Sequence, residues 1–234
     1  MRADPTLFER HARDWWNERS PAFRSLHAVN EFRVALLASW LGARISGATV
    51  VDLGSGGGLL AEPMARAGAA RVIGVELGKA SVVAARAHAN GTGVLAYVRA
   101  DLQSVPLRSG CADVVLLADV LEHVPSWRAA VAEASRLLRP KGLLYVNTLN
   151  RTWRARLLAV TLAEGIGLVP RGTHDARMFI KPDELVEAAG DAGLGLLRLQ
   201  GERPRLVRTL LARAIHLAPS RGTSVIYSAL FERR

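Results

Sequence analysis

The sequence centres on one glycine-rich stretch, Val50-Val51-Asp52-Leu53-Gly54-Ser55-Gly56-Gly57-Gly58-Leu59-Leu60. An apolar run that ends in an acid, passes four glycines and becomes apolar again predicts a β-strand that turns sharply into a helix. Glycines in such a turn allow backbone N–H groups to approach a ligand closely and tolerate positive φ angles. The stretch therefore predicts a cofactor-binding loop, with a purely structural turn as the alternative.

Strand-like and helix-like segments alternate along the chain after this loop. The expected strands are 50–53, 71–76, 94–99, 114–118 and 143–148, and the expected helices are 59–67, 79–90 and 127–138. Such alternation predicts an α/β fold in which crossover helices cover both faces of a mostly parallel sheet. Ligands of these sheets bind beyond the carboxyl ends of the strands.

The chain is long enough for one sizeable hydrophobic core, with 234 residues of which 50% are hydrophobic. We expect a single domain, residues 1–234, in four parts. These are an N-terminal helical cap (1–45), a cofactor-binding core (48–150), a lid or membrane-facing insert (151–182), and C-terminal helices and strands (183–234).

Charge and cysteine content limit the function classes. The net charge is +10, but no basic patch with interleaved aromatic residues is evident, so a nucleic-acid partner is not expected. The single cysteine, Cys111, excludes an intramolecular disulfide. With neither a signal peptide nor a run of roughly 18 apolar residues, a cytoplasmic protein is expected, soluble or peripheral on the inner face of the membrane.

Acidic residues end three of the expected strands. Asp52 precedes the glycine loop, Glu76 suits the hydroxyls of a ribose, and Asp101 suits an adenine amino group. A dinucleotide fingerprint that starts at Gly54 and Gly56 would need its third glycine at Leu59, so a nicotinamide-dependent oxidoreductase is disfavoured. A cofactor with an amino-acid tail fits better, with Asp52 near its ammonium group.

Several motifs resemble class I S-adenosylmethionine-dependent methyltransferases, and among them the O-methyltransferases of ubiquinone biosynthesis. They are Trp15-Trp16, Leu26-His27 with Asn30 and Arg33, the glycine loop, Leu121-Glu122-His123-Val124-Pro125, Thr148-Leu149-Asn150-Arg151, Gly172-Thr173-His174-Asp175 and Phe179-Ile180-Lys181-Pro182. The resemblance implies a Rossmann-like, mostly parallel sheet of seven strands. It also places Arg33, Gly54, Glu76 and Ala118 at cofactor-contacting positions, where Arg33 suits the methionyl carboxylate.

Methyl transfer to a phenol needs a base, or a cation that stabilises the phenolate. If the segment after the fourth strand turns helically, Asp119, Glu122 and His123 lie on one side of it. The resemblance implies that these three side chains bind Mg²⁺, although a histidine ligand also suits other divalent cations. Without a metal, His123 is the best general base. In the resembled family the loop that holds His174 lies near the substrate, and Asn150 is a second candidate for substrate contact.

The acceptor is less defined than the donor. The apolar segment 153–169, bordered by arginines, suits either an anionic membrane surface or a lid over the site. The first expectation is O-methylation of a phenol or catechol, with a polyprenyl benzoquinol precursor as the specific candidate. A soluble natural-product phenol, amine or carboxylate is the alternative, because Gly201-Glu202-Arg203-Pro204-Arg205 departs from the family pattern. A non-catalytic module that binds the adenosyl cofactor or nucleic acid stays open, and the sequence does not predict an oligomeric state.

Overall fold

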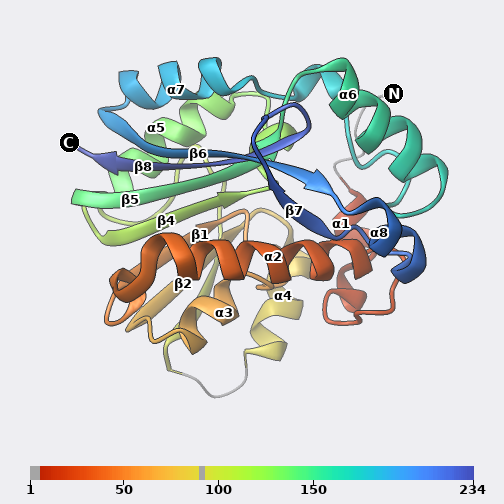
Figure 1. Cartoon of the computed structure of the whole chain (residues 1–234). Helices are drawn as coiled ribbons and strands as arrows, with labels where there is room; N and C mark the ends of the chain where they lie inside the picture. The colour runs from red at the N-terminus through yellow and green to blue at the C-terminus, as the bar shows by residue number, and fades with distance from the viewer. Residues whose placement is uncertain (1–5, 90–92) are drawn as a thin grey trace.

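The described chain is built on one twisted, mixed β-sheet (Figure 1). The computed structural model describes residues 6–89 and 93–234. Within them the strand order is β3-β2-β1-β4-β5-β8-β6-β7. The strands are β1 (Thr49–Leu53), β2 (Arg71–Glu76), β3 (Leu95–Arg99), β4 (Ala112–Ala118), β5 (Leu138–Leu149), β6 (Leu194–Pro204), β7 (Leu217–Ser220) and β8 (Ile226–Arg233).

The first five strands pair in parallel, which confirms the predicted α/β architecture. The predicted count of seven strands is one too few for the described residues. The C-terminal part supplies three strands, since β6 pairs antiparallel with both β7 and β8. The basic stretch after Arg203 forms the end of β6, the short helix α8 and β7.

Helices cover both faces of the sheet, with α2, α3 and α4 on one side and α5 and α7 on the other (Figure 1). The α-helices are α1 (Leu7–Arg10), α2 (Arg24–Leu41), α3 (Ala61–Arg66), α4 (Lys79–His88), α5 (Trp127–Leu137), α6 (Trp153–Ala155), α7 (Pro182–Asp191) and α8 (Leu206–Ala212). Short 3-10 turns are η1 (Ala12–Asp14), η2 (Gly42–Ile45), η3 (Leu121–His123) and η5 (Ala176–Met178), and η4 (Arg156–Ala163) is π-helical. The expected end of the helix 79–90, at Asn90, lies outside the described residues.

The central strands are buried on both faces because almost every side chain in them is apolar. Val51 and Leu117 pack in the cluster under α5 and α7, whereas Val50 and Leu116 pack in the cluster under α2 and α3. Successive side chains of a strand point to opposite faces, so two consecutive residues pack into the two hydrophobic clusters on either side of the sheet. Full burial of one such side chain contributes about 1.5–3 kcal/mol.

The N-terminal segment folds as a cap on the glycine loop. Trp15 is buried, stacks on Phe23 with ring centroids 4.2 Å apart, and donates from Nε1 to Ser81 Oγ at 3.0 Å. Trp16 Nε1 donates to the Gly57 carbonyl at 3.0 Å. Packing, rather than ligand contact, is thus the structural role of the buried Trp15.

The segments of functional interest lie at the carboxyl ends of the parallel strands, which form one edge of the sheet. The strands β1, β4, β5 and β6 all run in the same direction, because β6 and β5 are each antiparallel to β8. The glycine loop, the insert after β5 and the helix α8 after β6 therefore leave the sheet at the same edge. In the described part of the chain, no helix combines the length and the hydropathy that crossing a membrane would need.

Candidate active site

The glycine loop adopts a backbone that only glycine tolerates easily. Gly54 and Gly56 have φ angles of 77° and 52°. A Cβ atom at Gly54 would meet Val120 Cγ2 at 2.4 Å, and one at Gly56 would meet the Trp15 ring at 2.4 Å. The loop is therefore packed between the segment after β4 and the N-terminal cap, and a side chain at either glycine would open it.

Asp52 lies at the end of β1 beneath this loop and is almost fully buried. Burial, with a smaller contribution from the charge of Glu76, raises the pKa of Asp52 to about 7. Among the described residues its Oδ2 atom has no hydrogen-bond partner. A buried carboxyl group without a partner favours a cationic ligand nearby, because a positive charge offsets the cost of burial.

Glu76 ends β2 and accepts two backbone hydrogen bonds, from Gly56 N at 3.0 Å and from Gly78 N at 2.7 Å. Burial nevertheless raises its pKa. Glu76 thereby ties the loop to the end of the second strand, and its remaining lone pairs are available to ribose hydroxyls. The two carboxyl groups thus suit a ligand that carries both a positive charge, near Asp52, and ribose hydroxyls, near Glu76.

Two other predicted cofactor residues lie at neighbouring strand ends. Ala118 is the last residue of β4 and pairs with Asn147 of β5. Asp101 follows β3, is exposed, and accepts from Gln103 N at 2.9 Å. Asp101 therefore stands at the edge of the site, whereas Asp52 and Glu76 stand within it.

Arg33 is buried on α2 with its guanidinium surrounded by oxygen atoms. Its Nε and Nη2 donate to Asn147 Oδ1 at 3.0 and 2.7 Å, and its Nη1 donates to Asn30 Oδ1 at 3.1 Å. Its Nη2 also pairs with Asp119 Oδ2 at 2.5 Å. Most of the donors expected for a methionyl carboxylate are thus occupied within the protein.

The predicted three-ligand metal site does not form. The spacing argument assumed a helical turn from Asp119, but Asp119 has a φ of 51°, and only Leu121–His123 turns as a 3-10 helix. Asp119 consequently faces Arg33. Across residues 6–89 and 93–234, no group of three or more His, Cys, Asp or Glu side chains is placed to hold a metal ion.

Glu122 and His123 face different environments. Glu122 is buried, accepts from Thr148 Oγ1 at 2.8 Å, and leaves Oε1 without a partner among the described residues. Burial and the charge of Asp119 raise the pKa of Glu122 to about 8. Burial and the neighbouring His174 lower the pKa of His123 to about 4. Near neutral pH, His123 is therefore an uncharged imidazole, with one ring nitrogen that can accept a hydrogen bond.

A second histidine, His174, lies close to His123. The ring centroids of His123 and His174 lie 6.1 Å apart, and the Phe8 ring lies edge-on to His123 at 6.0 Å. His174 is held by Glu164 of the insert, which accepts from His174 N at 2.9 Å and lies 3.4 Å from His174 Nδ1. Glu164 also accepts from Gly172 N at 2.8 Å, so it fixes the whole loop.

Sequence reasoning missed Glu164 and the polar groups around Arg33. Glu164 lies outside every recognised motif. The signal that the sequence offers is an acidic residue within the apolar segment 153–169, because a buried acid needs hydrogen-bond partners. The side-chain amide of the predicted Asn150 is engaged by the C-terminal part of the chain. Its Nδ2 donates to Thr223 O at 2.7 Å, which connects the end of β5 to the loop before β8.

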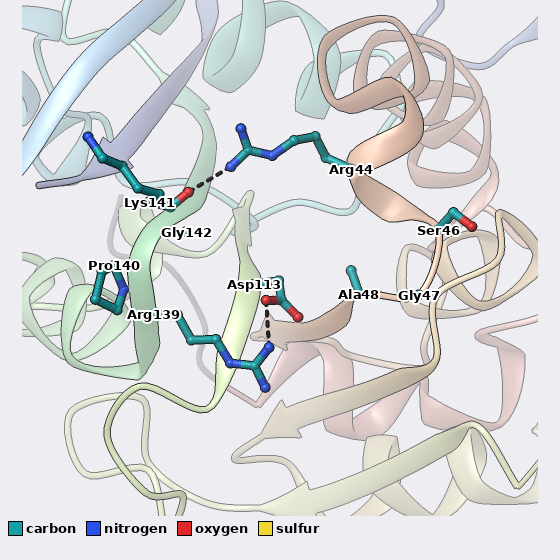
Figure 2. A pocket seen from close by; sticks show the side chains of 9 residues that line it. All are labelled: Arg44, Ser46, Gly47, Ala48, Asp113, Arg139, Pro140, Lys141 and Gly142. Carbon is teal, nitrogen blue, oxygen red and sulfur yellow. Dashed lines mark hydrogen bonds and ion pairs between the residues drawn. The ribbon is translucent and has the colours of Figure 1, made fainter.

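The pocket in Figure 2, of about 390 Å³, lies at the opposite edge of the sheet. It is lined by the start of β4 and the turn within β5, where Asp113 pairs with Arg139 at 2.7 Å and Arg44 donates to Lys141 O at 2.7 Å. None of the predicted site residues lines it. We assign the chemistry instead to the carboxyl ends of the parallel strands. Asp52 and Glu122, each with one carboxyl oxygen that lacks a partner among the described residues, lie there with His123 and His174.

Proteins of similar sequence include methyltransferases. Residues 51–146 match the methyltransferase domain family. A ubiquinone biosynthesis O-methyltransferase of Pseudomonas paraeruginosa is 41% identical over 82% of this chain and 82% of its own length. One from Cupriavidus pinatubonensis is 37% identical over 99% of this chain and 91% of its own.

Solved structures share the fold at lower identity. Magnesium protoporphyrin IX methyltransferase of Synechocystis, with bound SAH, superposes with a TM-score of 0.69 and 21% identity over 98% of this chain and 95% of its own. A possible histamine N-methyltransferase of Thermotoga maritima superposes with a TM-score of 0.69 and 17% identity, over 97% and 99% of the two chains. Together with the relatives above, these similarities show that the chain belongs to the ubiquinone biosynthesis O-methyltransferase family of S-adenosylmethionine-dependent methyltransferases.

Proposed function

We propose that the protein methylates a phenol or catechol oxygen of a polyprenyl benzoquinol precursor of ubiquinone type. The observation that carries this proposal is the facing pair of imidazole rings, His123 after β4 and His174 of the insert, whose centroids lie 6.1 Å apart. An S-adenosylmethionine molecule supplies an electrophilic methyl group on a positively charged sulfur. The names of the relatives support an acceptor of this class.

The donor is held, in this proposal, by the loop at Gly54 and Gly56 and by the two carboxyl groups beneath it. Asp52 lies near the ammonium and Glu76 accepts from the ribose hydroxyls. Arg33 binds the methionyl carboxylate with the guanidinium donor that its three partners leave free. Ala118 contributes its backbone, and Asp101 lies at the adenine end.

His123 accepts the phenol proton as the oxygen attacks the methyl carbon. Orientation of the oxygen against the methyl group supplies much of the acceleration, and proton removal by a positioned base contributes about 10²–10⁴-fold. His174 and the loop around it border the acceptor, while Glu122 in its protonated form holds Thr148 at the floor. Asp119 is not a ligand for Mg²⁺ or another cation in this proposal, because its carboxylate is engaged by Arg33.

The insert supplies the second part of the proposal, contact with an anionic membrane surface. Trp153, Leu157, Leu162 and Ile166 are between 41% and 70% exposed, and Arg154 and Arg156 are exposed beside them. A long prenyl tail resides in a bilayer, so an enzyme that binds it benefits from docking there. If the insert acts only as a lid, Leu157→Glu/Leu158→Glu will leave vesicle flotation unchanged.

Labelled S-adenosylmethionine tests the acceptor class. The enzyme is incubated with a prenylated catechol, a soluble phenol, an amine and a carboxylate of similar size. We expect the label in a methoxy group of the catechol. Faster labelling of a soluble phenol, an amine or a carboxylate would favour the natural-product alternative.

A further inference from the structure

The helix α8 carries an apolar face that the rest of the chain leaves uncovered. Leu206, Val207, Leu210 and Leu211 are 63%, 73%, 61% and 83% exposed. Their spacing of i, i+1, i+4 and i+5 places them on one side of the helix, while Thr209 is buried on the other. Single exposed leucines are ordinary, but four on seven residues form a contiguous apolar surface.

Basic residues border this face at both ends of the helix. Arg205 and Arg208 are exposed, and Arg213, with a left-handed φ of 51°, ends the helix and is exposed as well. There are no acidic residues between Glu202, which is buried, and Glu232. An apolar stripe with an arginine border matches the interface of an anionic bilayer, where tails bury the leucines and headgroups pair with the guanidinium groups.

Topology places this surface beside the insert. Both segments follow the carboxyl ends of parallel strands, β5 and β6, and Figure 1 shows α6 and α8 at the same end of the molecule. Ser25 of α2 joins them, since its Oγ donates to Leu168 O at 2.5 Å and accepts from Ile215 N at 3.1 Å. Arg24 Nη2 adds a bond of 2.8 Å to Gly167 O.

We infer that α8 is a second membrane-docking element, which presses the carboxyl edge of the sheet onto an anionic bilayer together with the insert. The inference rests on the proposed function for its lipid acceptor, but it concerns a surface that is separate from the catalytic groups. With two anchors flanking the α2 N-terminus, the site faces the bilayer in one orientation. A prenylated acceptor then enters from the lipid without crossing water.

Cosedimentation with vesicles tests this role. Wild-type protein is mixed with vesicles of equal parts phosphatidylcholine and phosphatidylglycerol, or of phosphatidylcholine alone. Leu211→Glu is compared with Val83→Glu, which places the same charge on an exposed apolar site of α4. We expect Leu211→Glu to weaken binding to the anionic vesicles by roughly tenfold, and Val83→Glu to leave it unchanged.

A charge-matched pair separates specific from general electrostatics. Arg205→Gln/Arg208→Gln and Arg44→Gln/Arg71→Gln lower the net charge equally, but the second pair lies at the opposite edge of the sheet. Loss of each α8 arginine is expected to weaken binding about fivefold, since one basic residue near an anionic surface contributes about a factor of that size. Retained S-adenosylhomocysteine binding shows that each variant is folded.

Three outcomes would overturn the inference. Leu211→Glu could bind vesicles as the wild type does, both arginine pairs could weaken binding equally, or Leu211→Glu could dissociate a dimer without affecting vesicle binding. The last result would assign α8 to a second copy of the chain. Methyl transfer by the wild type to a short-chain, water-soluble catechol is measured in parallel. If the wild type does not methylate this catechol, the result counts against the proposed function and not against the role of α8.

Discussion

At the residue scale, the site is defined by carboxyl groups and histidines whose protonation is set by burial. Asp52 and Glu122 have raised pKa values of about 7 and 8, and His123 has a lowered pKa of about 4. A carboxyl group that is neutral at neutral pH can donate a hydrogen bond, and an uncharged imidazole can accept a proton. In the proposed mechanism, His123 is therefore a neutral base, and the protonated Glu122 adds no negative charge beside the acceptor.

The raised pKa of Glu122 predicts a dependence of stability on pH. Because the folded state binds this proton more tightly than the unfolded chain, the contribution of Glu122 is complete below pH 4.5 and is lost as pH rises through about 8. Glu122→Gln should flatten the fall in unfolding free energy across this interval. Urea unfolding at several pH values measures it, with Glu187→Gln, an exposed acid on α7, as the control. Parallel curves for wild type and Glu122→Gln would contradict the assignment.

Glu164 is predicted to act as a positioning residue through His174. Glu164→Ala removes the acceptor for Gly172 N and His174 N, so the loop that borders the acceptor loosens. We expect kcat/KM for the acceptor to fall by about ten- to a hundredfold, with S-adenosylhomocysteine affinity unchanged. Glu164→Gln, which keeps an oxygen acceptor, should restore part of the activity. An equal fall of kcat/KM in Glu164→Ala and Glu164→Gln would contradict positioning by hydrogen bonds and would point to the negative charge of Glu164.

The sequence predicted the positions of residues that depend on local pattern, such as Asp52 and Glu76, but not the contacts between distant segments. The acids at the ends of β1 and β2 followed from strand periodicity. The side chain of Asp119 was misplaced because its left-handed φ and its bond to Arg33 of α2 depend on tertiary contacts. Glu164 and His174 are paired by a chain reversal that no spacing in the sequence encodes.

At the element scale, the glycine loop is tightly constrained by the side chains packed against it. Gly56→Ala would push a Cβ atom into Trp15 at a φ of 52°, which should cost about 1–3 kcal/mol and weaken S-adenosylhomocysteine binding. Thermal unfolding and calorimetric titration measure the two effects. Gly190→Ala, at a helical position in α7 with open space around the Cβ, should be neutral or stabilising. Unchanged binding in Gly56→Ala would show that the loop does not hold the cofactor.

The elements that the sequence predicted least well lie in the C-terminal part. The apolar and basic composition after Arg203 favours one helix, but Pro204 ends β6 and the left-handed Arg213 ends α8, so β7 can return as an edge strand. The core strands were predicted closely because both of their faces are buried and their composition is continuous.

At the scale of the whole molecule, one sheet edge combines the donor loop, the histidines, the insert and α8. The division into cap, core, insert and C-terminal part stays a prediction, but it agrees with how these segments are arranged around that edge. A cofactor that binds the folded chain but not the unfolded chain raises thermal stability. A concentration of S-adenosylhomocysteine about 100 times its Kd should add about 2.7 kcal/mol, whereas NADH at the same concentration should add nothing. Stabilisation by NADH alone would contradict the choice of cofactor.

The most direct test is a single-turnover transfer from methyl-labelled S-adenosylmethionine to a prenylated catechol, with wild type compared to His123→Ala. The label should appear in a methoxy group of the product. The rate should fall by about 10²–10⁴-fold in His123→Ala, while S-adenosylhomocysteine affinity stays unchanged. A full rate in His123→Ala, or label on nitrogen or carbon, would contradict O-methylation with His123 as the base.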